Sequence, residues 1–165
     1  MKFEDYVAAR GRALERYAYV LTGDAQASED LVQTALVKAY THWRWVERAD
    51  QPDLYVRRIV TTTFLDGTRR RSSSERPVAD VPDRGSDPAH DPAHRVVVRD
   101  ELSRALARLT PQQRAVLVLR HFEGYDDMAI AKVLGCSTST VRSHCSRGLD
   151  GLRTYLRSEQ EAGET

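Results

Sequence analysis

The stretch DDMAIAKVLGCSTSTVRSHCSRGL, residues 126–149, decides the fold of this chain. Its apolar residues recur at helical spacing and stop at Gly135, a residue type that readily adopts the left-handed conformation that ends a helix. Ser137 then offers a hydroxyl to the free backbone amides of a second helix. Three apolar residues follow at four-residue spacing along one face of that helix: Val141, Cys145 and Leu149. Two short helices joined by such a tight turn predict a helix-turn-helix.

The second helix of this motif carries the side chains that would meet a DNA groove. Its outer face consists of Ser139, Thr140, Arg142, Ser143, Ser146 and Arg147. Between residues 136 and 157, four arginines stand against the single acid Asp150, although the whole chain carries a formal charge of only +1. So few cations predict weak DNA binding that salt weakens further. An ordinary helical hairpin with a purely structural apolar face is the alternative interpretation.

The composition indicates a globular protein of one medium domain or two small ones. The 165 residues are 41% hydrophobic and 30% charged. No stretch approaches the roughly 18 consecutive apolar residues of a membrane span, and the N-terminus lacks the basic-then-apolar order of a signal peptide. We therefore expect a cytoplasmic protein without membrane insertion. In that setting Cys136 and Cys145 are expected to be reduced, buried thiols.

Helical periodicity predicts three helices before residue 70, over residues 3–21, 25–40 and 52–65, the last ending at Asp66-Gly67. The second of these turns five polar side chains outward: Glu29, Asp30, Gln33, Thr34 and Lys38. A solvated surface and a docking surface for a partner explain this face equally well. Trp43 and Trp45 precede the third helix and, being two residues apart, cannot both lie in the core.

The third predicted helix contains three consecutive threonines, Thr61, Thr62 and Thr63. The aromatic and basic residues in this helix and directly after it are Tyr55, Arg57, Arg58, Arg69, Arg70 and Arg71. Aromatic and hydroxyl groups interleaved with arginines suit single-stranded nucleic acid, in which bases stack and phosphates need cations. A basic, solvated helix end is the alternative.

Residues 71–95 contain four of the six prolines and almost no large apolar residue, which predicts a flexible linker. His90, Asp91 and His94 have the spacing of metal ligands on a helix, but the neighbouring prolines disfavour a helix there, so we expect no metal site. Residues 96–160 form the second helical unit, in which Thr110-Pro111 starts a helix, and 161–165 form a tail. The predicted fold is all-α, with two small helical domains joined by the linker and a four-helix C-terminal domain that contains the helix-turn-helix.

The order of these parts resembles the extracytoplasmic function (group IV) sigma factors of bacterial RNA polymerase. Four segments carry the resemblance: SEDLVQTALVKAY in 28–40, LYVRRIVTTTFLDGTRRR in 54–71, LTPQQRAVLVLRHFEGY in 109–125 and DDMAIAKVLGCSTSTVRSH in 126–144. Together they cover both helical units in the right order. The second unit by itself also resembles the DNA-binding domain of LuxR-type regulators.

The resemblance implies a transcription initiation factor that is not an enzyme and needs no cofactor. Residues 1–70 would form sigma region 2, which binds the clamp helices of the largest polymerase subunits and opens the promoter at its minus-10 element. Residues 96–160 would form sigma region 4, which reads the minus-35 element and meets the polymerase flap. The implied polymerase-binding residues are Asp30, Gln33, Thr34 and Lys38. Those for minus-10 DNA are Tyr55, Arg58, Thr61, Thr62, Thr63, Arg69 and Arg70, and those for minus-35 DNA are Ser139, Thr140, Arg142, Ser143 and Arg147.

The chain departs from this family at one position of the third helix. Many relatives have Asn there, followed four residues later by Asp, whereas this chain has Thr62 before Asp66. A threonine lacks the paired donor and acceptor of an amide, so we expect a different base preference at the minus-10 element. An anti-sigma factor is a further partner that the resemblance implies. The alternatives are a LuxR-type regulator that binds DNA unaided and a sigma-like interaction module without promoter-opening activity.

Overall fold

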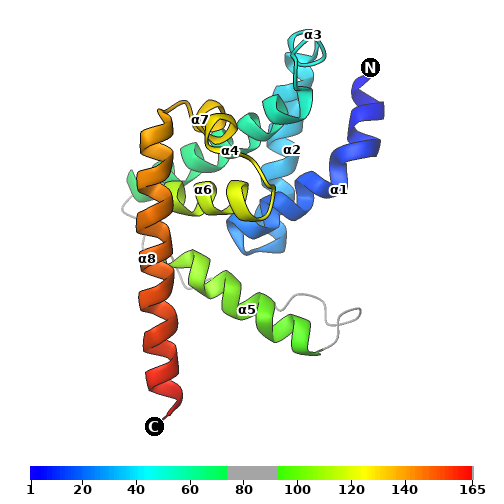
Figure 1. The fold of residues 1–165 in the computed structure, drawn as a ribbon. Coiled ribbons are helices and arrows are strands. Elements are labelled where there is room, and N and C mark those ends of the chain that lie inside the picture. The colour runs from blue at the N-terminus through cyan, green and yellow to red at the C-terminus, as the bar shows by residue number, and fades with distance from the viewer. Residues whose placement is uncertain (74–92, 165) are drawn as a thin grey trace.

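The computed structural model describes residues 1–73 and 93–164, with side chains described for 1–73 and 100–164, and this part of the chain is helical as predicted. The described residues form eight helices, whose arrangement Figure 1 shows. They are α1 (Phe3–Thr22), α2 (Ala25–Thr41), α3 (Trp43–Val46), α4 (Pro52–Ser73), α5 (Ala93–Ala107), α6 (Pro111–His121), α7 (Asp127–Leu134) and α8 (Thr138–Gly163). Helices α1 to α4 form the N-terminal unit and α5 to α8 the C-terminal unit.

The N-terminal unit starts with α1 packed along α2, as the periodicity predicts. Gly23 ends α1 in the left-handed conformation, with φ 68°. The Asp24 side chain then accepts a hydrogen bond from the Ala27 amide at 2.8 Å and so caps α2. A tight turn between two well-defined ends holds the helices close enough for their apolar faces to share a core, whose largest fully buried members include Leu14, Tyr17 and Leu21.

Helix α4 is longer than predicted, because it continues through Asp66-Gly67 to Ser73. A glycine inside a helix costs only about 1 kcal/mol. The burial of Phe64 and Leu65 just before it fixes the helix and outweighs that cost. The prediction for the two tryptophans is confirmed: the Trp43 ring packs edge-on against Phe3, while Trp45 is 69% exposed.

The C-terminal unit begins as the sequence indicates and ends later. The Thr110 hydroxyl caps the Gln113 amide while the Gln113 side chain accepts from the Thr110 amide, which completes a capping box. Gly135 ends α7 with φ 66°, and the Ser137 hydroxyl caps α8, so the predicted helix-turn-helix is confirmed. Residues 161–163, predicted to be tail, are instead the last residues of α8.

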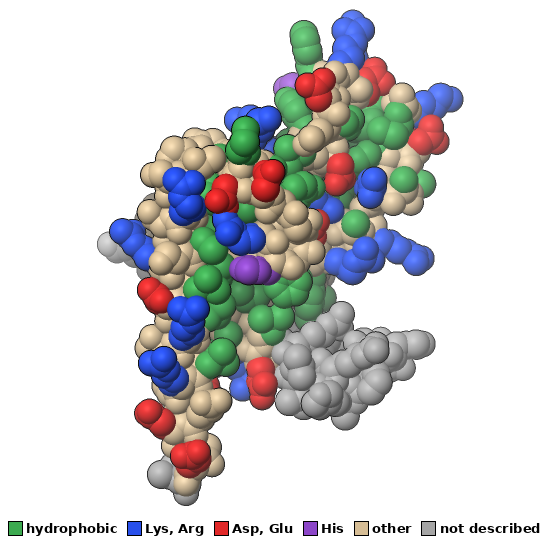
Figure 2. Space-filling view, in the orientation of Figure 1, with side chains coloured by type: hydrophobic (Ala, Val, Ile, Leu, Met, Phe, Trp, Pro, Cys, Tyr) green, Lys and Arg blue, Asp and Glu red, His purple; other side chains and the backbone are tan. Residues whose placement is uncertain are grey.

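The two units pack directly against each other, a relation that the sequence left open. Helix α4 lies against α7 and α6, and α1 also contacts α6. Buried apolar residues of both units therefore form one continuous cluster. On the face shown in Figure 2, hydrophobic side chains gather between α8 and the N-terminal unit, while both basic and acidic side chains line α8.

Several sequence expectations concern membranes, metals and thiols. Among the described residues, no helix is long and apolar enough to cross a membrane, and no cluster of three or more potential metal ligands occurs. The candidate ligands His90 and Asp91, and the side chain of His94, lie outside the described residues. Both cysteines are free, with Cys145 buried and Cys136 half-buried, and burial raises the pKa of the Cys136 thiol.

The crossing of α8 over α6 depends on Gly148, which the sequence analysis did not single out. Gly148 is buried, and a Cβ atom there would lie 3.0 Å from Leu117 Cδ1 and 3.5 Å from Gln113 Cβ. Close approach of the two helices at this point sets the direction in which α8 leaves the domain. The small residue is thus required by packing and not by backbone conformation.

We expect Gly148→Val to lower the free energy of unfolding by about 1–3 kcal/mol, because the added side chain overpacks the α6–α8 contact. Urea titration followed by circular dichroism measures the change. Gly11→Ala is the control, since its Cβ would lie 3.7 Å from Val7 Cγ1, an ordinary contact. That variant should be unchanged or up to about 1 kcal/mol more stable. Equal midpoints for both variants would show that the crossing tolerates a side chain.

Candidate nucleic-acid interface

The first half of α8 presents a polar, basic surface. Ser139, Ser143, Arg142 and Arg147 are exposed, while Val141 and Cys145 on the opposite side of the helix are buried in the core. Among the described residues, neither Arg142 nor Arg147 forms an ion pair. Two unpaired guanidinium groups at the start of the second helix of a helix-turn-helix are free to contact phosphates or guanine edges.

Thr140 is placed differently from its neighbours on α8. It is half-buried, and its hydroxyl lies 3.0 Å from Ser137 Oγ, which also accepts a hydrogen bond from the Thr140 amide. The hydroxyl therefore takes part in the start of the helix. Its predicted contact with minus-35 DNA stays a prediction.

A hollow beside this surface is lined by further basic residues of α6 and α8. Its lining includes Arg120, Arg142 and Arg153 together with Asp150. Arg120 pairs with Asp127 at the start of α7, and Arg153 lies 3.5 Å from Asp150. These two arginines are thus partly neutralised, whereas Arg142 keeps its full charge available for a ligand.

Helix α4 carries the second candidate surface. Tyr55 is 37% exposed, and Arg58, Arg69 and Arg70 are exposed. At 100° per residue, Tyr55, Arg58, Thr62 and Arg69 fall on one side of the helix. The helix tolerates its three consecutive threonines because their hydroxyls donate to carbonyl oxygens of the preceding turn.

Thr62 and Thr63 are half-buried and bond back to their own helix. Thr62 Oγ1 donates to the Arg58 carbonyl at 2.8 Å, and Thr63 Oγ1 donates to the Ile59 carbonyl at 2.6 Å. The Lys38 ammonium of α2 donates to Thr63 Oγ1 at 3.1 Å. A residue predicted to bind polymerase and one predicted to bind DNA are therefore in direct contact.

The assignment of Thr61 to the DNA-contacting set is wrong in this structure. Thr61 is completely buried, its hydroxyl lies 2.6 Å from the hydroxyl of Tyr17, and it also donates to the Arg57 carbonyl at 2.7 Å. Residues 61, 62 and 63 point in three directions because successive helix positions differ by about 100°. Only Thr62 of the three shares the side of Tyr55 and Arg58.

The outer face of α2 exposes the four residues predicted to bind polymerase: Asp30, Gln33, Thr34 and Lys38. The sequence analysis missed two apolar neighbours, Val37 and Tyr40, which are 65% and 61% exposed. Their position on the outward side of the helical period was the available signal. Exposed apolar groups beside polar ones are typical of a protein-binding surface, and the role of the four polar residues stays a prediction.

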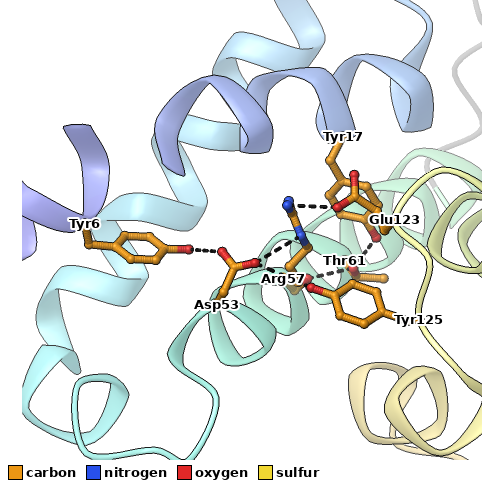
Figure 3. A network of polar contacts seen from close by, with 7 residues as sticks. All are labelled: Tyr6, Tyr17, Asp53, Arg57, Thr61, Glu123 and Tyr125. Atoms are coloured by element: carbon orange, nitrogen blue, oxygen red, sulfur yellow. Dashed lines mark hydrogen bonds and ion pairs between the residues drawn. The ribbon is translucent and has the colours of Figure 1, made fainter. Parts of the chain in front are cut away.

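A buried polar network joins α4 to the loop after α6, as Figure 3 shows. Arg57 is 4% exposed, its Nη2 lies 2.8 Å from Glu123 Oε2, and its Nε lies 3.8 Å from Asp53 Oδ2. The hydroxyl of Tyr6 donates to Asp53 Oδ1 at 2.8 Å, and that of Tyr125 donates to Asp53 Oδ2 at 3.5 Å. Helical periodicity gives no information on such pairs, which are 47 to 72 residues apart.

Burial and charge act in opposite directions in this network. Burial acts to lower the pKa of Arg57, but the negative charges of Glu123 and Asp53 outweigh it, so that the pKa is raised and the guanidinium stays charged. Burial likewise raises the pKa of Glu123, against the opposing effect of Arg57. Burial is also the main cause of the raised pKa of the Tyr6 and Tyr17 hydroxyls, which remain protonated donors.

Comparison with known proteins supports the resemblance. The family model for Sigma-70 region 2 matches residues 6–74, and the model for Sigma-70, region 4 matches residues 99–150. The RNA polymerase sigma-E factor of Streptomyces coelicolor is 37% identical over 157 residues, which is 94% of this chain and 86% of that protein. This chain belongs to the extracytoplasmic function sigma factors of the sigma-70 family.

One further relative and one solved structure are informative. The ECF RNA polymerase sigma factor SigL of Mycobacterium tuberculosis is 31% identical over 156 residues, covering 92% of this chain and 85% of the relative. The sigma factor RpoE of Bartonella quintana, solved in complex with the anti-sigma factor NepR, has the same fold, with a TM-score of 0.75 at 23% identity over 94% of this chain and 96% of that one. The protein therefore directs RNA polymerase to promoters and is not an enzyme.

We expect Thr61→Val to lower the free energy of unfolding by about 1–3 kcal/mol, because the substitution leaves the buried Tyr17 hydroxyl without its partner. Thr62→Val is the matched control, since it removes a hydroxyl that bonds only to its own helix, and its effect should be below about 1 kcal/mol. Urea titrations of the two variants provide the comparison. A loss as large for Thr62→Val as for Thr61→Val would contradict the structural role of Thr61.

Proposed function

We propose that this sigma factor reads the minus-35 element with the first half of α8 and holds the melted minus-10 strand on the outward side of α4. The observation that carries the first part is the pair of exposed, unpaired arginines, Arg142 and Arg147, on the second helix of the helix-turn-helix. Ser139, Ser143 and Thr140 would add hydroxyl contacts to phosphates or base edges. Arginine is suited to bidentate contact with guanine, which gives base discrimination.

The minus-10 surface is proposed to consist of Tyr55, Arg58, Thr62 and Arg69, with Arg70 and Thr63 at its edges. Tyr55 supplies a partly exposed ring on which a base stacks, and the arginines supply cations for the phosphates of a single strand. Thr62 offers a methyl group, while its hydroxyl is already bonded to its own helix. This favours an apolar contact with a base over a hydrogen bond to it.

The outer face of α2 is the proposed docking surface for the clamp helices of core polymerase. Asp30, Gln33, Thr34 and Lys38 supply its polar groups and Val37 its exposed apolar centre. Because Lys38 also bonds to Thr63, docking and minus-10 recognition would occur on adjoining surfaces. The polymerase flap is the proposed contact of the C-terminal unit.

An anti-sigma factor is included among the proposed partners, since RpoE of Bartonella quintana is solved with one. Such a protein should suppress run-off transcription when it is mixed with the sigma factor before core polymerase is added. Addition after the holoenzyme has formed should have little effect. Equal suppression in both orders would point to an inhibitor of polymerase.

Gel shifts with purified protein separate this proposal from a LuxR-type regulator, which would bind its site tightly without polymerase. A sigma-like interaction module would bind polymerase without supporting transcription from any promoter. Reconstituted run-off transcription with core polymerase therefore tests the proposal as a whole, and transcripts starting at selected promoters are the expected result.

We expect the double variant Arg142→Ala, Arg147→Ala to lose minus-35-dependent run-off transcription while still binding core polymerase. Removing each phosphate contact should also lower the slope of log affinity against log salt by about 0.9 for the holoenzyme on promoter DNA. Arg157→Ala is the control, because Arg157 lies on the same helix about 15 Å or more farther along its axis. Unchanged promoter selection by the double variant would refute the assignment of α8.

We expect Asp30→Lys to weaken binding to core polymerase at least about tenfold, equivalent to ~1.4 kcal/mol, because it reverses a charge at the proposed docking surface. Run-off transcription at limiting sigma should fall accordingly. Glu15→Lys makes the same reversal on an exposed position of α1 and should bind like the wild type. Equal affinities for all three proteins, measured by fluorescence anisotropy, would exclude this part of α2 from the docking surface.

A further inference from the structure

A cavity lies where α5 passes the turn between α1 and α2 (Figure 1). Its volume is about 520 Å³, within the range of roughly 300–1,000 Å³ that ligand pockets in proteins occupy. Its lining comes from α1, α2 and α5 and from the loop after α6. None of the lining residues belongs to the proposed polymerase-binding or DNA-binding sets, so neither of those surfaces accounts for the cavity.

The wall of this cavity is mainly apolar. Val20, Leu102 and Leu106 contribute aliphatic side chains, and Leu106 is only 4% exposed. The rings of Tyr19 and Phe122 also line the cavity, and Phe122 is 52% exposed. Aliphatic and aromatic groups around a concave space favour a flat, apolar ligand, because such a ligand removes the apolar surface of both partners from water.

The charged residues around the cavity balance one another. Glu15 and Arg16 are consecutive on α1 and carry opposite charges. Glu123 is paired with the buried Arg57, whose Nη2 lies 2.8 Å from Glu123 Oε2. The described lining therefore carries no excess charge that an ionic ligand would neutralise. A charged ligand would lose its hydration without gaining an opposite charge, so the lining favours a neutral ligand.

One hydroxyl of the lining is available for hydrogen bonding. Ser103 of α5 is half-buried, and its Oγ forms no hydrogen bond with any residue that the structure describes. The other serine of the lining, Ser28, is already satisfied, because its hydroxyl donates to the Ala25 carbonyl at 2.8 Å. A hydroxyl can both donate and accept. A single free hydroxyl in an apolar wall therefore orients a ligand that carries one hydrogen-bonding group.

We propose that this cavity binds a neutral, largely aromatic small molecule that makes one hydrogen bond with Ser103 Oγ. The site goes beyond the proposed function, because its residues have no assigned part in promoter or polymerase binding. A ligand that binds the folded chain and not the unfolded one raises the melting temperature by mass action. The cavity therefore gives this sigma factor the means to be stabilised directly by a small molecule.

The fluorescent probe phenylnaphthylamine has the required chemistry, with two apolar ring systems, no charge and one N–H group. We expect saturable fluorescence enhancement with the full chain, at a dissociation constant of about 1–100 µM. Anilinonaphthalenesulfonate has the same ring skeleton with an added sulfonate, and as the matched control it should bind at least tenfold more weakly. Equal or tighter binding of the sulfonate, or no saturable enhancement with phenylnaphthylamine, would overturn the proposal.

Ala25→Trp tests where the probe binds. Ala25 is an exposed residue of the lining, so a larger side chain there fills the cavity from its edge. We expect the affinity for phenylnaphthylamine to fall at least tenfold and the rise in melting temperature that the probe causes to disappear. Ala9→Trp makes the same change at an exposed position of α1 outside the lining and should bind like the wild type. Equal affinities of the two variants would place the probe elsewhere and overturn the proposal.

Ser103→Ala tests the hydrogen bond and decides the matter if Ala25→Trp does not fold. We expect the affinity for phenylnaphthylamine to fall about 2–10-fold, the loss of one hydrogen bond. Ser158→Ala removes a hydroxyl at an exposed position of α8 and should bind the probe like the wild type. Unchanged affinity of Ser103→Ala would overturn the assigned hydrogen bond. Run-off transcription by the wild type tests the proposed function separately, so failure of one leaves the other standing.

Discussion

The buried guanidinium of Arg57 is the interaction on which the packing of the two units depends. It lies on α4, it is accompanied by Asp53 and Tyr17 within its own unit, and it meets Glu123 across the junction. A buried cation needs a close anion, because the free energy lost when the cation leaves water is larger than the stabilisation that dispersion contacts provide. The loop after α6 therefore has to lie where Glu123 reaches Arg57, and this places α7 on α4.

The remaining contacts follow from that placement. With the C-terminal unit held against α4, the apolar faces of α6 and α7 complete one cluster with those of α1 and α4. The two units are each small, and burial against each other removes further apolar surface from water. The same contact places α7 of the helix-turn-helix directly against α4, so the two proposed DNA-reading units adjoin each other.

Helix ends and helix faces were predictable because they depend on local chemistry. Gly135 ends a helix, and Ser137 and Thr110 start helices, as predicted, since capping involves residues only a few positions apart. Errors arose where packing overrides local preference. Helix α4 continues past Gly67 because Phe64 and Leu65 are anchored in the core, and Thr61 points inward because Tyr17, 44 residues away, takes its hydroxyl.

By itself, the amino-acid sequence determined the helical class, the two units in order, the helix-turn-helix and the family, because periodicity, caps and motif spacing are properties of neighbouring residues. It also supplied the candidate surfaces on α2, α4 and α8. Only the tertiary structure decided which threonine of α4 faces outward, which arginines are already paired and how the units sit on each other. Those features depend on Arg57–Glu123, Arg114–Leu21 and Tyr17–Thr61, contacts between residues far apart in the chain that no local pattern specifies.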